Sequence, residues 1–305
     1  MSVRISVLLV ALLVFVSGYF TFAPDAQAQT QASCTFKIFQ LNPTDSTNPG
    51  TNPNGVNDFD SVVGAAVSPP TSTITEKAFV RFSGGGVSYF SPSGAISTQF
   101  YARNNSGVTV GDYSDGPFQN HAFMLQGSTL TMLVDPKAKP DSTDVRGINK
   151  FNSTVGSYTD TNGKEHGFKR YSNGSFNDLN FPGGSQATNP NGINDSGAIV
   201  GSYTAANASL NGFIFHNGSW ATLNFPNTTG TELFGISNAG VIVGLDHSTE
   251  SGRAFMYSNG VFKVISVPNS FSTEATGIAP GGLITGRVNV SGSDSGDRGF
   301  TATCK

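Results

Sequence analysis

One ten-residue phrase recurs six times along this chain and limits the fold more than any other feature. The block GINDSGAIVG (192–201) aligns without a gap with GVNDFDSVVG (55–64), ARNNSGVTVG (102–111), GINKFNSTVG (147–156), GISNAGVIVG (235–244) and GIAPGGLITG (277–286). The blocks start 47, 45, 45, 43 and 42 residues apart. Self-similarity at this period indicates one structural unit repeated along the chain, as in propellers and solenoids.

The block itself predicts a tight turn followed by a strand. Its sixth position holds the residue types that tolerate a positive φ: Asp60, Gly107, Asn152, Gly197, Gly240 and Gly282. Its third position holds mostly side chains that can cap a turn: Asn57, Asn104, Asn149, Asn194, Ser237 and Ala279. The tenth position is always Gly, which predicts close approach of two backbones or a bulge.

A second phrase follows each block and supplies further strands. It reads KAF (77–79), HAF (121–123), HGF (166–168), NGF (211–213), RAF (253–255) and RGF (298–300). A hairpin signal such as SNG (172–174) and another strand ending near Pro come next. Each repeat therefore offers a short strand entering the block and three clearer strands. Four antiparallel strands in 42 to 47 residues correspond to one propeller blade.

The two ends of the chain fit together as one unit. The sixth copy stops at 298–305, before its last strand, and the segment 34–43 has the pattern of that strand. Cys34 and Cys304 fall where the other repeats have their hairpin turn, so we expect a disulfide there; two free buried thiols are the alternative. The sequence thus predicts an all-β, six-bladed β-propeller as a single domain over 29–305, with the N-terminal strand closing the last blade.

Residues 1–28 have the features of an export signal. Arg4 precedes the apolar run 5–16, and AQA (26–28) matches a cleavage site. An uncleaved anchor and a lipid anchor on Cys34 are the alternatives. We therefore expect a secreted, extracellular or periplasmic protein with no membrane segment after cleavage.

Composition narrows the choice of partners. Charged residues make up 12% of the chain, about half of the usual share, and the formal net charge is −3. This balance gives no reason to expect a nucleic acid or an acidic membrane as partner. We expect a monomer.

The chain also resembles a known family. GINDSGAIVGSY (192–203), NHAF (120–123) and HGF (166–168) with FPGG (181–184) are similar to the bacterial extracellular repeats of the HAF family. The resemblance spans nearly all of 34–305 and implies a secreted repeat protein of β-propeller type. It implies no catalytic residues and no ligand, and the first two blocks depart most from its pattern.

We find no motif that specifies a metal, a cofactor or a catalytic centre. His121 and His166 occupy one repeat position, which is Lys, Asn or Arg elsewhere, and equivalent residues of neighbouring blades do not converge on a metal. His216 and His247 lie in a turn and a loop. DTNG (160–163) lacks the later acidic ligand of a calcium loop. Carboxylates that could serve glycoside hydrolysis are Asp112, Asp115, Asp144, Asp160, Glu165, Glu232, Asp246, Glu250, Glu274, Asp294 and Asp297.

The remaining prediction is a binding surface. Function usually lies in variable loops on a rigid scaffold, and the longest and least alike segments here are 43–54, 65–76, 135–146 and 287–298. The residue before each block enters an inner strand and is expected to ring the mouth of the channel: Asn54, Tyr101, Arg146, Asn191, Phe234 and Thr276. These side chains suit a carbohydrate or an extracellular protein as ligand. A glycan-active hydrolase or lyase and a purely structural envelope protein are the alternatives.

Overall fold

The computed structural model describes residues 19–20, 30–41, 50–67, 76–117, 119–183, 185–290 and 297–305. Every regular element in these ranges is a β-strand, which confirms the all-β prediction. The described ranges contain no helix, and hence none long and apolar enough to cross a membrane. The predicted signal segment 1–28 lies outside the described residues, apart from the two that form β1 (Tyr19–Phe20).

The same strand pattern recurs along the sequence. The first three repeats contain β4 (Thr51–Val56), β5 (Val62–Val67), β6 (Glu76–Arg81) and β7 (Val87–Phe90); β8 (Ser97–Arg103), β9 (Thr109–Ser114), β10 (Asn120–Gln126) and β11 (Thr129–Met132); β12 (Ala138–Ile148), β13 (Thr154–Asp160), β14 (Glu165–Arg170) and β15 (Phe176–Leu179). The later repeats contain β16 (Ala187–Ile193), β17 (Ile199–Thr204), β18 (Leu210–His216) and β19 (Ser219–Thr222); β20 (Thr231–Ile236), β21 (Ile242–Asp246), β22 (Arg253–Ser258) and β23 (Val261–Val264); β24 (Ser272–Ile278), β25 (Ile284–Asn289) and β26 (Asp297–Cys304).

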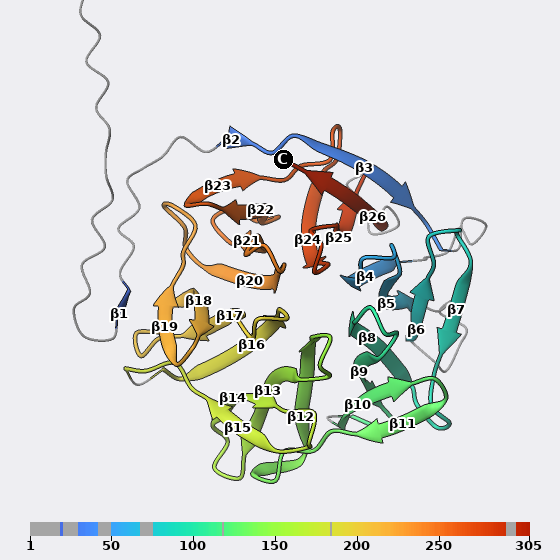
Figure 1. Cartoon of the computed structure of the whole chain (residues 1–305), viewed down its shortest axis with the longest axis vertical. Coiled ribbons are helices and arrows are strands. Elements are labelled where there is room, and N and C mark those ends of the chain that lie inside the picture. Colours follow the sequence, from blue (N-terminus) through green and yellow to red (C-terminus); the bar gives the residue numbers. More distant parts are fainter. Residues whose placement is uncertain are drawn as a thin grey trace, which may run out of the picture.

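Within a repeat, each strand pairs antiparallel with the next one along the chain. The groups lie side by side around a common centre, and the first strand of each group is the innermost (Figure 1). This arrangement is a β-propeller. Short parallel pairings of β6 with β8 and of β10 with β12 join the first three repeats into one continuous sheet.

The N-terminal segment follows the outer edge of the last repeats. β2 (Thr30–Gln31) pairs in parallel with β23, and the amide of Ala32 donates to the carbonyl of Val264 at 2.8 Å. β3 (Cys34–Phe39) then pairs antiparallel with β26, with Cys34 opposite Cys304. The two cysteines form a disulfide across a sequence separation of 270 residues, which confirms that prediction.

The first strand of each repeat is longer than its sequence suggests. We predicted a short strand before each block, but these strands have six to eleven residues, whereas the fourth strand (β7, β11, β15, β19, β23) has four. Pro53 and Pro190 lie within two of these strands. Proline lacks an amide N–H, yet an edge strand tolerates it because one side of the strand needs no ladder hydrogen bond. The innermost strand is such an edge.

The core lies between neighbouring repeats and is marked by one aromatic residue per repeat. The Phe of each second phrase is fully buried: Phe79, Phe123, Phe168, Phe213, Phe255 and Phe300. Phe123, for example, packs with Phe100 of its own repeat and with Val63 and Ala78 of the preceding one. Burying a side chain of this size contributes roughly 1.5–3 kcal/mol, so the repeated Phe stabilises adjacent units against each other.

Candidate functional site: a central cavity between two rings of side chains

Each innermost strand carries a β-bulge at the position we predicted to be functional. The register between the first and second strands shifts between Pro53 and Gly55, and the equivalent shift recurs in the other repeats. The extra residue in each bulge is the one before the block. We call these residues the bulge ring: Asn54, Tyr101, Arg146, Asn191, Phe234 and Thr276. A bulge turns a side chain away from the regular alternation of the strand, which is why bulges are common beside functional sites.

Glycine at the tenth block position makes the bulge sterically feasible. A Cβ at Gly156 would overlap the carbonyl oxygen of Asp144, and a Cβ at Gly201 would overlap that of Asn189. The same close approach occurs at Gly64, Gly111, Gly244 and Gly286. The predicted backbone contact at this glycine is therefore confirmed. This close approach lets the first and second strands of a repeat stay paired on both sides of the extra residue.

All six residues of the bulge ring line one central cavity of about 360 Å³. The structure thus brings together the residues that the sequence placed at equivalent repeat positions. Whether they bind a ligand stays a prediction.

Three members of the bulge ring are used in contacts between repeats. The Nδ2 group of Asn54 donates to the carbonyl oxygen of Phe100 at 2.9 Å. Asn191 donates in the same way to Leu233 at 3.0 Å, and Thr276 Oγ1 donates to Pro53 at 2.7 Å. The last of these bonds joins the sixth repeat to the first. For Tyr101, Arg146 and Phe234 no bond of this kind to the next repeat is found among the described residues.

Tyr101 and Arg146 lie beside two carboxyl groups, those of Asp112 and Asp144. We call these four residues the acidic corner. The guanidinium of Arg146 donates from Nε (2.8 Å) and from Nη2 to the same oxygen, Oδ2, of Asp144. It also lies over the ring of Tyr101, 4.1 Å from the ring centre. Both contacts fix the position of the Arg146 side chain.

Asp112 is the most deeply buried carboxyl of the acidic corner, with 8% of its surface exposed. It lies on β9, and the nearby side chains of Tyr101 and Asn120 act to lower its pKa. Burial, together with the charge of Asp144 and against the opposing effect of Arg146, raises the pKa of Asp112 to about 7. Burial is also the main reason why the pKa of Tyr101 lies well above its ordinary value.

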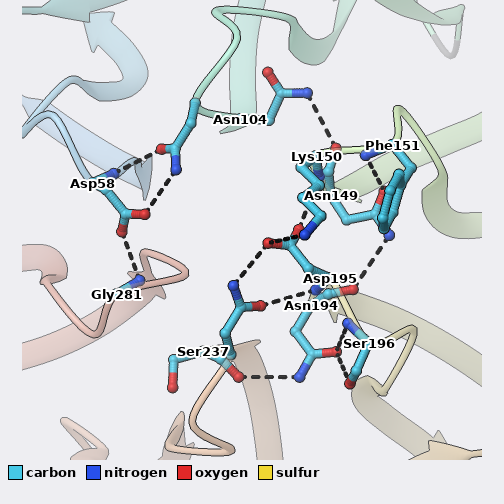
Figure 2. A network of polar contacts seen from close by, with 12 residues as sticks. Asp58, Asn104, Asn149, Lys150, Phe151, Asn194, Asp195, Ser196, Ser237 and Gly281 are labelled. Atoms are coloured by element: carbon cyan, nitrogen blue, oxygen red, sulfur yellow. Dashed lines mark hydrogen bonds and ion pairs between the residues drawn. The ribbon is translucent and has the colours of Figure 1, made fainter.

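A second ring lies at the turns of the blocks, and we call it the turn ring (Figure 2). It consists of the third- and fourth-position residues. The Oδ1 atom of Asn194 accepts hydrogen bonds from the amides of Ser196 (3.1 Å) and Ala198 (2.9 Å), which confirms the predicted capping role. Its Nδ2 group donates to the carbonyl of Ser237 in the next repeat at 3.1 Å. Asn57, Asn104 and Asn149 each make the same three contacts.

The fourth position adds contacts that the sequence did not suggest. Asp195 accepts from the amide of Lys150 (3.0 Å) in the preceding repeat and from Nδ2 of Asn238 (2.7 Å) in the next one. Asp58 accepts in the same way from the amide of Gly281 (2.6 Å) and from Asn105 (2.7 Å). Because this position holds Asp, Asn, Lys or Pro, no shared role could be seen in the aligned blocks. At the sixth position, the predicted positive φ is confirmed in all six copies.

Our sequence analysis also missed a threonine four residues before each block: Thr51, Thr98, Thr143, Thr188, Thr231 and Thr273. All six are buried. In the later repeats the hydroxyl oxygen accepts from the backbone at the end of the preceding repeat, as from Phe225 to Thr231 at 3.0 Å. The identity of this residue in every copy was visible in the sequence and could have revealed the contact.

Of the other candidate residues, Glu165 and Glu232 also line the central cavity, whereas the remaining ones in the described ranges do not. His121 contacts Asp115 (3.0 Å) and Asp141 (3.4 Å), His166 contacts Asp160 (3.2 Å), and His247 contacts Glu232 (3.1 Å). His216 ends β18. Arg253 pairs with Asp246 and Arg287 with Glu274. Across the described ranges, no three His, Cys, Asp or Glu side chains are placed to hold a metal ion. Asp294 lies outside those ranges.

The predicted variable loops are only partly described. Residues 42–49, 68–75 and 291–296 lie outside the described ranges, so a role for those loops stays a prediction. The segment 135–146 is not the loop we expected, because most of it belongs to β12. Its residues Ser142 and Thr143 pair with Asn120 and His121 of β10, and this pairing extends the strand.

Comparisons with known proteins support the fold and do not assign a family. No family model and no curated protein matches the sequence. Among solved structures, TolB from Acinetobacter baumannii is similar at 14% identity, with a TM-score of 0.58, over 81% of this chain and 65% of that one. Virginiamycin B lyase from Staphylococcus aureus is similar at 13% identity and a TM-score of 0.50, over 89% and 99% of the two chains.

A lectin has the same architecture. Aleuria aurantia lectin, solved in complex with alpha-methyl-L-fucoside, is 10% identical with a TM-score of 0.50, over 90% of this chain and 94% of that one. At these identities the likeness concerns the β-propeller fold alone.

Proposed function

We propose that this protein is a secreted β-propeller that binds a carbohydrate or protein ligand in its central cavity. The observation that carries the proposal is the bulge ring. Its six residues differ in chemistry although the backbone around them repeats, and all six line the same cavity. Variable side chains on a repeated backbone, gathered around one cavity, are typical of a binding site on a rigid scaffold.

We further propose that the propeller has six blades, one for each copy of the block, and is closed by its N-terminal strand. The pairing of β3 with β26 and the disulfide between Cys34 and Cys304 support this closure. The bonds from Thr276 to Pro53 and from Gly281 to Asp58 support it as well, because they join the last repeat to the first. A disulfide is also consistent with export from the cytosol after removal of residues 1–28.

Three residues of the bulge ring should make the main ligand contacts. Tyr101 and Phe234 offer aromatic rings, and Arg146 offers a fixed guanidinium. Asn54, Asn191 and Thr276 are already engaged with the next repeat. Aromatic rings combined with a few fixed polar groups are typical of small-ligand sites.

A second candidate is a glycan-active hydrolase or lyase. The acidic corner favours it, because Asp112 with a pKa of about 7 lies near a second carboxylate, Asp144. Two carboxyl groups in different environments can act as acid and base. Both lie on strands, β9 and β12, and not on the loops where we expected such residues.

The test is a glycan array and an extracellular-protein binding screen with the secreted protein, combined with a reducing-sugar release assay. We expect binding without release of sugar, and we expect Arg146→Ala and Tyr101→Ala each to weaken binding at least tenfold. Asn177→Ala on β15, outside the cavity, is the matched control. Binding that survives both cavity variants would place the ligand elsewhere. Sugar release that is lost in Asp112→Asn would favour the enzyme, and no ligand at all would favour a structural role.

A further inference from the structure

Two phenylalanines are exposed at the same position of the block. Phe59 and Phe151 hold its fifth position in the first and third repeats, with 64% and 56% of their surfaces exposed. The other repeats have a small residue there: Ser106, Ser196, Ala239 and Gly281. Single exposed aromatic residues are common on protein surfaces. Because these two occupy equivalent positions of a repeated backbone, they lie on the same face of the propeller, and we call them the rim pair.

The turn itself does not require an aromatic side chain at this position. The amide of Phe151 donates to Asn149 Oδ1 at 3.0 Å, and the amide of Ser196 donates to Asn194 Oδ1 at 3.1 Å. Phe59 makes the same bond in its own turn at 3.1 Å. The backbone contact is therefore the same with Phe as with Ser. An exposed phenyl ring also gains none of the stabilisation that burial would give it. The turn geometry thus gives no structural reason for the two rings.

The rim pair lies beside the central cavity. Lys150, which directly precedes Phe151, is one of the residues that line the cavity. Asp58, which directly precedes Phe59, donates its amide to Oδ1 of Asn105, another lining residue, at 3.0 Å. The ammonium group of Lys150 lies over the ring of Phe151, 4.9 Å from its centre, at the turn ring (Figure 2). This contact fixes the ring where the cavity meets the surface.

The charged groups that line the cavity are balanced within the protein. Four carboxylates stand against three basic side chains, so the lining has a formal charge of −1. Three of the carboxylates have a basic partner: Asp144 has Arg146, Asp195 has Lys150, and Glu232 has His247. Arg103 and Glu165 are hydrogen-bonded to neutral groups. The lining therefore favours neither a cationic nor an anionic ligand.

The cavity still offers hydrogen bonds to a neutral polar ligand. The side chain of Arg146 is 40% exposed, and its Nη1 group makes no hydrogen bond within the described part of the chain. Such a group can donate to a hydroxyl oxygen. The volume of about 360 Å³ lies in the range of small-ligand sites. The cavity thus suits a small neutral unit with several hydroxyl groups.

We propose that the protein binds a neutral oligosaccharide that enters the central cavity from the turn-ring face, with Phe59 and Phe151 stacking against its sugar rings. This inference rests on the proposed binding function and names the class of its ligand. A sugar ring combines an apolar C–H face, which packs on an aromatic ring, with hydroxyl groups that need hydrogen-bond partners. The rim pair meets the first need, and the polar lining of the cavity meets the second.

A protein partner fits this face less well. The core of a protein interface is a continuous area that is more apolar than the rest of the surface. The two rings of the rim pair belong to the first and third repeats, and the turn of the second repeat between them carries Asn105 and Ser106. Separate aromatic rings on a polar face match successive units of a chain that is itself polar.

The test measures binding of oligosaccharides to the mature protein by isothermal titration calorimetry. The neutral probes are cellohexaose, maltohexaose, mannohexaose and chitohexaose, and hexagalacturonic acid is the acidic counterpart. We expect at least one neutral hexasaccharide to bind, and to bind at least tenfold more tightly than hexagalacturonic acid. The reason is that a charged ligand would lose its hydration without gaining an ionic partner in this lining.

Protein variants locate the sugar contact, with the strongest neutral hexasaccharide as probe. We expect Phe59→Ser and Phe151→Ser each to weaken binding at least fivefold, the loss typical of a removed stacking contact. Both variants should fold, because serine holds this position in the second and fourth repeats. Phe151→Tyr keeps the ring and should bind within twofold of the unchanged protein. The matched control is Phe271→Ser, since Phe271 is 70% exposed directly before β24, at the opposite end of that strand from the block. Its affinity should also stay within twofold.

The outcomes that overturn the inference differ from those that overturn the proposed function. A hexasaccharide whose binding is lost in Tyr101→Ala but unchanged in both serine variants would leave the binding function intact and remove the rim pair from the site. Tighter binding of hexagalacturonic acid would do the same for the neutral ligand. Binding of an extracellular protein but of no neutral hexasaccharide would overturn the inference alone. Failure of every oligosaccharide and every protein would overturn the proposed function as well.

Discussion

The turn ring and the bulge ring lie only a few residues apart in each repeat, yet they follow opposite rules. In the turn ring, four successive repeats place Asn at the third block position, and each Asn bonds to the next repeat. In the bulge ring, the corresponding contact is made within the described residues by Asn54, Asn191 and Thr276 alone. The other three positions hold Tyr, Arg and Phe. Regular contacts thus hold the repeats together at the turns and leave the bulges free to differ.

The physical reason is the number of bonds that each side chain must make. A turn-ring Asn accepts from two amides of its own turn and donates to the next repeat, so few other side chains can replace it. A bulge needs only the close backbone approach that the tenth-position glycine permits. Its side chain can change without loss of the strand pairing. We therefore expect mutations in the two rings to affect different properties.

The largest effect should come from the acidic corner and should depend on pH. Burial raises the pKa of Asp112 from 3.8 in the unfolded chain to about 7. Between these values the folded state binds more protons than the unfolded state, so stability falls as pH rises from about 4 to about 7 and stays low above 7. Asp112→Asn removes the carboxyl group whose ionisation causes this fall in stability. We expect it to raise the free energy of unfolding by about 2–4 kcal/mol at pH 8.

Urea unfolding at pH 5 and pH 8 measures this difference. The gain of Asp112→Asn should shrink markedly at pH 5, where Asp112 of the unchanged protein is already protonated in the folded state. An equal gain at both pH values, or a loss at pH 8, would mean that Asp112 is not held in the buried environment described here.

Features that recur in every repeat were predicted well from the sequence. Contacts between non-equivalent positions of different repeats were not predicted. The turn geometry followed from residue types that tolerate a positive φ, such as Asn152 and Gly197, and the disulfide followed from the positions of Cys34 and Cys304. The bulge ring was placed from repeat alignment alone. The acidic corner could not be predicted, because Asp112 and Asp144 belong to different repeats and meet only through packing. Alignment compares equivalent positions and does not reveal contacts between non-equivalent ones.

The next effect compares two asparagines of the same repeat, Asn194 in the turn ring and Asn191 in the bulge ring. Asn194→Ala removes four hydrogen bonds and leaves the buried amide of Ala198 without its side-chain acceptor, so we expect a loss of about 3 kcal/mol. Asn191→Ala removes one bond to Leu233 and should lose about 1 kcal/mol. Urea unfolding of both variants measures the two losses in free energy of unfolding. Equal losses would contradict the division between a scaffold ring and a variable ring.

The smallest effect tests whether the junction between the last and the first repeat resembles the internal junctions. Asp58 and Asp195 occupy the same block position, and each accepts from an amide of the preceding repeat and from an Asn of the next. For Asp58 the preceding repeat is the sixth. If the turn ring is continuous, Asp58→Ala and Asp195→Ala should each lose about 1 kcal/mol in urea unfolding, because both contacts lie near the surface. A loss at Asp195 without one at Asp58 would show that the first and last repeats separate in solution, and that only β3 and the disulfide join them.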